Sequence, residues 1–187
     1  MPAYNSTIQQ THLKGSSMKS RLPFTFPVLC LSLSVVIGGC QYTRGNVVSA
    51  SAKQNRLSTY HSLIRTAELN NVLAKDGPYT MFAPTNEAFN NLSSETLSNL
   101  KRPENREDLV AMLTYHIVPG EMMLDTLKKD QTLTTQNGAQ IKINESSGQL
   151  MYGDGRIINP DIKATNGVIH VIDKVQMPPK FKFQVHK

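Results

Sequence analysis

The stretch that most constrains the fold is residues 79–89, because it contains a strand, a stop signal and a helix start in immediate succession. Tyr79–Phe82 consists of residues that favour extended backbone. Pro84 has no amide hydrogen and therefore interrupts a strand ladder. Thr85 is a favourable helix N-cap, and a carboxylate at Glu87 suits the first turn of a helix. The sequence thus predicts a short strand that passes directly into a helix.

Helical periodicity dominates the first half of the chain around this stretch. An apolar stripe runs from Leu57 to Leu73, with an expected break near residues 69–71. A second stripe predicts a helix with one apolar face at Leu109, Met112, Leu113 and His116. Asn105 and Asp108 in front of it resemble a capping box.

The second half changes to the periodicity of strands. Asn137-Gly138 is a strong hairpin signal, and the residues on either side of it alternate between apolar and polar. We expect strands at residues 131–135, 139–144, 149–152, 156–162 and 168–172. Helices followed by strands indicate an α+β domain. The expected apolar core includes Phe82, Phe89, Leu109, Leu113, Ile141, Val168 and Ile172.

Two boxes of sequence carry a family resemblance. Residues 79–89 resemble the first signature box of the fasciclin domain family, and residues 165–175 resemble the second box. The resemblance covers residues 54–178. It implies a β-sandwich or wedge with helices packed in the N-terminal half, and a function in extracellular adhesion or binding, without naming a ligand.

The N-terminal region has the architecture of a secretory signal. Lys19 and Arg21 precede an uncharged and mostly apolar run at residues 22–39. Ile37–Cys40 resembles the bacterial lipobox, in which the Cys thiol receives a diacylglycerol and becomes the mature N-terminus. A secreted or membrane-anchored chain without this lipid is the alternative. The expected segments are an upstream extension at residues 1–17, a signal peptide at 18–39 and a lipidated Cys40.

The segments that flank the domain are polar. Residues 40–53 are small and polar, and we interpret Cys40 with the residues after it as a lipidated, flexible tether. Gln41 follows the Cys in place of an Asp, which favours the outer membrane as the anchoring site. The basic tail at residues 179–187 fits an edge strand, a disordered end or a contact with an anionic membrane.

Composition argues against a nucleic-acid ligand. The formal net charge is +6, but Lys14, Lys19 and Arg21 lie in the segment that we expect to be removed. The remaining charges are scattered, Trp is absent and aromatic residues are few. This pattern predicts an ordinary solvated surface with no nucleic-acid platform.

The resemblance also implies candidate binding residues. Tyr115-His116 matches the family's Tyr-His motif, and Asp161-Ile162 stands where the family has an Asp-Ile pair, both of which are linked to integrin binding in animal members. A structural role is the alternative, because His116 lies on the apolar stripe of its helix. His170 falls among apolar residues of the last strand, so we expect a buried His with a backbone or Asn partner and no metal site.

The sequence offers no recognised catalytic motif. It contains neither a Gly-x-Ser-x-Gly elbow nor a phosphate loop, and we expect no enzymatic activity and no cofactor. We therefore expect a lipid-anchored protein of a bacterial envelope that adheres to extracellular protein or polysaccharide. The alternative is an envelope carrier or sensor of a small hydrophobic or sugar ligand.

Overall fold

The computed structural model describes residues 45–75 and 77–181. The expected signal region, Cys40 and residues 182–187 of the tail lie outside the described residues, so what we expect of them stays a prediction.

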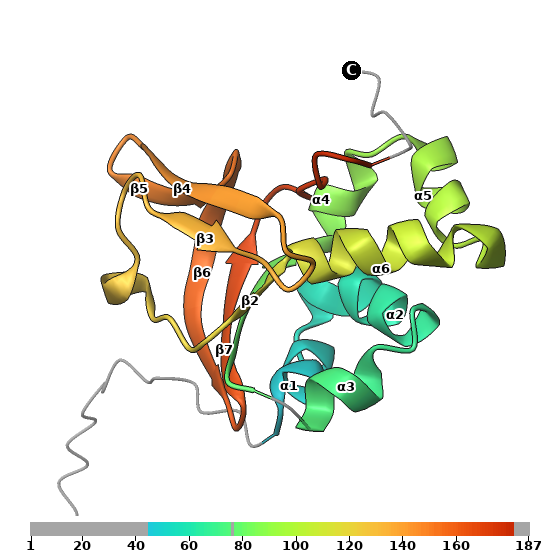
Figure 1. Ribbon diagram of the computed structural model, residues 1–187, viewed down its shortest axis with the longest axis horizontal. Coiled ribbons are helices and arrows are strands. Elements are labelled where there is room, and N and C mark those ends of the chain that lie inside the picture. Colours follow the sequence, from blue (N-terminus) through green and yellow to red (C-terminus); the bar gives the residue numbers. More distant parts are fainter. Residues whose placement is uncertain (1–44, 76, 182–187) are drawn as a thin grey trace, which may run out of the picture. The chain divides into compact units, whose positions relative to one another are not determined.

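Helices precede strands along the chain, with one strand inserted early (Figure 1). The helical elements are α1 (Val47–Ala52), η1 (Asn55–Leu57), α2 (Ser58–Thr66), α3 (Asn70–Lys75), α4 (Asn86–Asn90), α5 (Ser94–Leu100), η2 (Pro103–Asn105), α6 (Arg106–Tyr115) and η3 (Leu124–Thr126). The strands are β1 (Tyr79–Pro84), β2 (Ile117–Pro119), β3 (Thr132–Thr134), β4 (Gln140–Ser146), β5 (Gln149–Tyr152), β6 (Gly155–Ala164) and β7 (Gly167–Ile172). This order confirms the α+β class.

The seven strands form one sheet in the order β2-β1-β7-β6-β5-β4-β3. β1 is antiparallel to β2 and parallel to β7, and every residue of β1 and β7 is buried. The sheet curls until its outer strands, β2 and β3, approach each other. The Gln136 amide after β3 donates to the Ile117 carbonyl of β2 at 2.7 Å. The two layers of the expected sandwich are therefore one continuous, nearly closed sheet.

Two apolar clusters use opposite faces of the central strands, because side chains alternate along a strand. The helix-side cluster consists chiefly of Val47, Leu57, Tyr60, Leu63, Ile64, Phe89, Leu100, Leu109, Met112 and Leu113, with Tyr79, Met81, Ala83, Ile169 and Val171 from the sheet. The hairpin-side cluster consists of Phe82, Tyr115, Val118, Leu127, Leu133, Ile141, Ile143, Tyr152, Ile157 and Ile172. All seven residues that the sequence predicts for the core are buried.

The helix start after β1 is confirmed, whereas the expected capping box is wrong. The Thr85 hydroxyl accepts the Ala88 amide at 3.2 Å and so caps α4. Asn105 stands at the N-cap of α6 but makes no side-chain cap bond. Its backbone is not extended there because it also ends η2, and its side chain instead donates to the Asn99 carbonyl at 2.8 Å.

Part of the expected tether is also wrong. The residues from Val47 onward form α1, with Val47 and Ala50 fully buried in the helix-side cluster. Asn46 caps this helix, and the Val47 amide donates to the Asn166 side chain at 2.8 Å. Two valines and small Ala and Ser side chains allow α1 to pack closely, which a count of polar residues does not reveal.

Candidate functional site

A bulge in β6 organises one pair of the residues that the sequence nominates. The pairing of β6 with β7 shifts register between Asn159 and Ile162, and Asp161 adopts a left-handed φ of 61° there. The Asp161 carboxylate accepts the Leu124 amide at 2.8 Å, and its own amide donates to His170 Nδ1 at 3.1 Å. A bulge changes the direction of its strand and of its side chains. The two hydrogen bonds of Asp161 hold this bulge in place.

His170 behaves as the sequence predicts, as a buried His with backbone partners. It is fully buried, and its Nε2 donates to the Met122 carbonyl at 2.8 Å while Nδ1 accepts from Asp161. This pattern requires a neutral ring with the proton on Nε2. Burial lowers the pKa of His170, partly offset by the Met122 carbonyl and the Asp161 carboxylate.

Tyr115 and His116 are interior residues at the end of α6. The His116 ring is fully buried, donates from Nδ1 to the Met112 carbonyl at 2.8 Å, and accepts the Gln176 amide at Nε2 at 3.0 Å. Burial lowers the pKa of His116 to about 4. Tyr115 is 6% exposed, and its hydroxyl donates to the Gln140 carbonyl at 3.3 Å. These contacts join α6 to the strand region and to the segment after β7.

The structure does not gather the four nominated residues on one surface. Ile162 is 3% exposed and belongs to the helix-side cluster, whereas Tyr115 belongs to the hairpin-side cluster. Asp161 is the most accessible of the four, with 31% of its side chain exposed. The burial of Tyr115, His116 and Ile162 favours a structural role for the motif residues over direct contact with a ligand.

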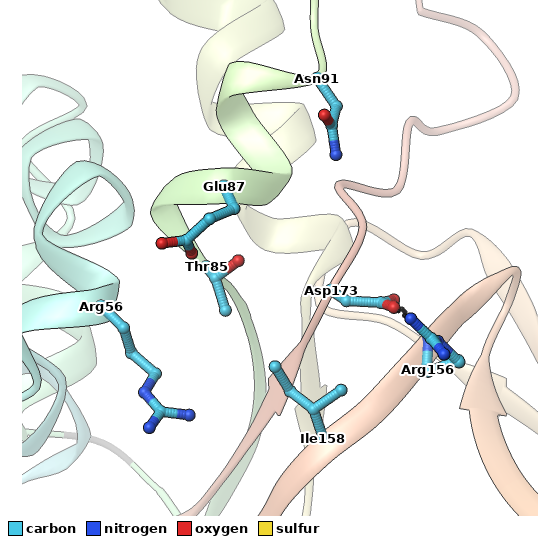
Figure 2. A pocket seen from close by; sticks show the side chains of 7 residues that line it. All are labelled: Arg56, Thr85, Glu87, Asn91, Arg156, Ile158 and Asp173. Carbon is cyan, nitrogen blue, oxygen red and sulfur yellow. Dashed lines mark hydrogen bonds and ion pairs between the residues drawn. The ribbon is translucent and has the colours of Figure 1, made fainter.

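A different surface has the form of a binding site, and no motif in the sequence indicates it. A hollow of about 510 Å³ opens between η1, α4, the start of β6 and the end of β7. Figure 2 shows Arg56 on one side, the Asp173–Arg156 pair on the other, and Ile158 between them. The residues that line it are Arg56, Thr85, Glu87, Asn91, Arg156, Ile158 and Asp173.

Two local features build this hollow. The Asn86 side chain fastens η1 and α2 to α4, because it donates to the Asn55 carbonyl at 2.9 Å and accepts the Thr59 amide at 2.9 Å. On the opposite side, β6 places two residues against one of β7 between Ile157 and Asn159. Ile158 is the extra residue of that bulge and is 42% exposed. The first link positions Arg56, and the second turns Ile158 outward.

The carboxylates in the hollow are occupied by donors of the protein. Both oxygens of Asp173 accept from Arg156, one from its amide at 2.8 Å and the other from Nε at 2.7 Å. Glu87 accepts its own amide and the Thr85 hydroxyl, and these bonds lower the pKa of Glu87. Two guanidinium groups and two carboxylates give the hollow a formal charge of zero. Both carboxylates already accept bonds from the protein, whereas the Arg56 guanidinium and the terminal nitrogens of Arg156 are not used in this way.

Within the described ranges, no group of three or more His, Cys, Asp or Glu side chains is arranged to hold a metal ion. In the same ranges, no helix is both long and apolar enough to cross a membrane.

Comparison with known proteins identifies the family. Residues 55–178 match the Fasciclin domain. The chain belongs to the fasciclin domain family. The match takes in β1 and β7, the two strands that contain most of the signature boxes, and it spans both apolar clusters apart from α1.

Relatives of this fasciclin domain occur in bacteria and animals. Protein sll1483 of Synechocystis is 36% identical over 133 residues, which cover 71% of this chain and 73% of that protein. Human Periostin is 35% identical over 128 residues, which cover 67% of this chain but 15% of Periostin. The structure of a FAS1 domain pair from the insect cell adhesion molecule Fasciclin I aligns with a TM-score of 0.65 at 18% identity, covering 74% of this chain and 53% of that one. This last likeness shows the shared fold.

Proposed function

We propose that this fasciclin-domain protein is held at the bacterial cell envelope by an acylated Cys40, in the outer membrane, and mediates non-enzymatic adhesion by binding extracellular protein or polysaccharide. The family match over residues 55–178 is the observation that carries the proposal. The insect protein of the same fold is described as a cell adhesion molecule, which supports the same class of function here. The lipobox-like sequence Ile37–Cys40 supports the anchor.

The interior chemistry supports binding over catalysis. A general base needs a ring nitrogen that can reach a substrate proton. Both ring nitrogens of His116 and of His170 are engaged by the protein's own backbone, and both rings are fully buried. These two histidines therefore serve as internal cross-links.

The surface chemistry supports an extended polar ligand over a small hydrophobic one. A carrier of a hydrophobic molecule needs an apolar cavity that encloses its cargo. The hollow beside α4 is lined by six polar or charged residues and one aliphatic residue, Ile158. Weak contacts of this kind become effective on a cell surface because many anchored copies act together.

The test compares cells that produce the chain with cells from which its gene is deleted. We expect deletion to reduce attachment to surfaces coated with matrix protein or polysaccharide, and the wild-type gene to restore it. A Cys40→Ser gene should not restore attachment, because the chain is then released from the envelope. Equal attachment with and without the gene would overturn the adhesive function. Full restoration by Cys40→Ser would overturn only the anchor.

The motif residues are poor choices for this test. Tyr115→Ala and His116→Ala would remove buried side-chain contacts and lower stability, so a loss of attachment would not identify a contact surface. Exposed residues of the hollow are better probes because their replacement leaves both clusters intact.

A further inference from the structure

From the geometry of the hollow between η1, α4, β6 and β7, we infer that it binds an acidic polysaccharide through the carboxylates of its sugars. The inference rests on the proposed adhesive function and narrows it to one ligand class and one surface. It concerns residues other than the motif pairs at Tyr115-His116 and Asp161-Ile162.

The hollow contains guanidinium and amide donors that the protein itself leaves unused. Arg56 is exposed and makes no hydrogen bond or ion pair with the described residues; its charge acts on Glu87 only at longer range. Arg156 uses its amide and Nε on Asp173, which leaves its terminal guanidinium nitrogens for a ligand. The Asn91 amide is exposed on the same rim. A ligand that fits these groups must be rich in acceptors.

The geometry of the arginine side chain also suits a carboxylate ligand. A guanidinium group presents a planar fork of donors that matches a carboxylate bidentately. Arg56 and Arg156 stand on opposite sides of the hollow, as Figure 2 shows, so a chain lying across it meets a guanidinium group at each side, with that of Arg156 already paired to Asp173 through Nε. A polymer with a carboxylate on each sugar supplies such repeated acceptors, and its hydroxyl groups can bond to Asn91.

The small apolar area of the hollow favours a sugar chain over a protein partner. Protein interfaces centre on buried aromatic or aliphatic anchors in a well-packed core. In the described part of the chain, the large apolar side chains with high exposure are Val72 and Ile158, and only Ile158 lines the hollow. One isoleucine on the floor suits the apolar face of a sugar ring, but it is a poor centre for a protein interface.

The hollow is held in place before any ligand arrives, which reduces the ordering that binding requires. Asn86 bonds to Asn55 and Thr59 on the Arg56 side. Arg156 and Asp173 hold each other across β6 and β7 on the other side. The two sides are joined by the ladder between β1 and β7, in which Pro84 is paired with Ile172.

The direct test measures binding of the purified full-length chain to oligomers of polygalacturonate by titration calorimetry. The same oligomers with methyl-esterified carboxylates are the ligand control. We expect binding to the free acid, little or none to the ester, and weaker binding as salt rises, because exposed charges are screened. Equal affinity for acid and ester would overturn the inference, as would a lack of binding to both.

Variants inside and outside the hollow show whether the polymer binds there. Arg56→Gln should weaken binding at least fivefold, and Ile158→Ser should weaken it less. Arg102→Gln is the control, because Arg102 is also exposed but does not line the hollow. Equal losses for Arg56→Gln and Arg102→Gln would show nonspecific charge attraction and overturn the site. Tighter binding of polyglutamate than of polygalacturonate, with the same sensitivity to Arg56→Gln, would make the partner an acidic protein.

The attachment assay distinguishes failure of this inference from failure of the adhesive function. Cells that produce Arg56→Gln should attach less to polygalacturonate-coated surfaces than cells that produce Arg102→Gln. If both variants restore attachment as fully as the wild type, adhesion stands and the hollow is not the contact. If the wild-type gene itself makes no difference, the adhesive function fails, and calorimetry alone decides whether the hollow binds uronates.

Discussion

The helix-side and hairpin-side clusters both take residues from β1, β2, β6 and β7 but are built in different ways. The helix-side cluster joins six α-helices, several of them a single turn or two long, whose buried residues lie close together in sequence. The hairpin-side cluster takes one or two residues from each of several strands and loops. Its centre is a stacked pair, Phe82 and Tyr152, with ring centroids 3.9 Å apart. The stability of the helix-side cluster therefore depends on many contacts, whereas that of the hairpin-side cluster depends mainly on the stacked pair.

Polar links reinforce the same contrast. On the hairpin side, the buried Tyr152 hydroxyl donates to the Tyr115 carbonyl at 2.6 Å, and Asn144 donates to the Gly153 carbonyl at 2.6 Å. On the helix side, short local caps at Thr85 and Ser93 satisfy helix ends. We expect a substitution in the shared strands to destabilise both clusters. A substitution within one cluster should cost more stability when fewer residues form that cluster.

The largest effect should come from Gly167→Ala, at the junction of the clusters. Gly167 has a φ of 146°, and an added Cβ would overlap the Tyr79 carbonyl oxygen and lie 2.7 Å from the Tyr79 amide nitrogen. Because backbone atoms cannot move aside cheaply, we expect a loss of more than about 4 kcal/mol in the free energy of unfolding. Urea denaturation measures it, or a loss of soluble protein reports it.

Gly138→Ala is the matched control in the outer hairpin. Gly138 also has a positive φ, 81°, but an added Cβ there meets nothing within 4 Å. Only backbone strain remains, and it should cost about 1–2 kcal/mol. If the two alanine variants were equally stable, the β1–β7 junction would not be the rigid element that joins the clusters.

The second prediction compares the clusters directly. Phe82→Ala removes half of the stacked pair and should cost about 3–5 kcal/mol, whereas Leu113→Ala in the helix-side cluster should fall lower in the range of about 2–5 kcal/mol. Phe82→Ala should also change the near-ultraviolet circular dichroism of Tyr152, which Leu113→Ala should leave intact. Equal costs and equal spectra would contradict the view that the hairpin-side cluster is the more concentrated one.

The sequence predicts those elements whose cause is local. The strand of residues 79–82, the Thr85 cap, the Asn137-Gly138 turn and the alternation of Ile141 and Ile143 all depend on neighbouring residues, and the structure contains them. β2 and α1 depend on distant partners. Three residues are too few to show a strand period, and α1 is recognised only by what it packs against.

The candidate sites show the same division more sharply. The resemblance nominates Tyr115, His116, Asp161 and Ile162 as contacts, but burial depends on how α6 and β6 meet the rest of the fold. The hollow unites Arg56 with Asp173, which are far apart in sequence. They come together through the bonds of Asn86 to Asn55 and Thr59 and through the parallel pairing of β1 with β7. No spacing along the chain signals such a site.

The third prediction concerns acid and the histidine that links α6 to the segment after β7. The pKa of His116 is about 4 in the folded state, because the ring is buried, and 6.5 is the ordinary value of a histidine in an unfolded chain. The unfolded state therefore binds the proton first, so stability should be complete above pH 6.5 and decline as the pH falls to 4, by about 3 kcal/mol in total. The lowered pKa of His170 adds to the decline with the same sign.

Urea denaturation at pH 7.5 and pH 4.5 measures this dependence. A His116→Gln variant should be less stable at both values but should show a smaller difference between them. Carboxylates with lowered pKa values, such as Asp154, contribute mainly near and below pH 4 and so do not account for the decline at higher pH. An unchanged difference in the variant would assign the acid sensitivity to other groups.

The smallest effect should come from Thr85→Ala, which tests a local cap at the point where the helix side meets the hollow. Losing the bond to the Ala88 amide should cost about 1 kcal/mol, and Thr85→Ser should retain most of the stability. The Thr85 hydroxyl also lowers the pKa of Glu87, so the alanine variant should raise that pKa, as carboxyl NMR titration can show. Removing the hydroxyl leaves the Glu87 carboxylate with an unused acceptor in the hollow. Thr85→Ala should therefore weaken uronate binding more than Thr85→Ser does. Equal binding by the two variants would mean that the bond from the Thr85 hydroxyl to the Glu87 carboxylate does not help the hollow to bind uronates.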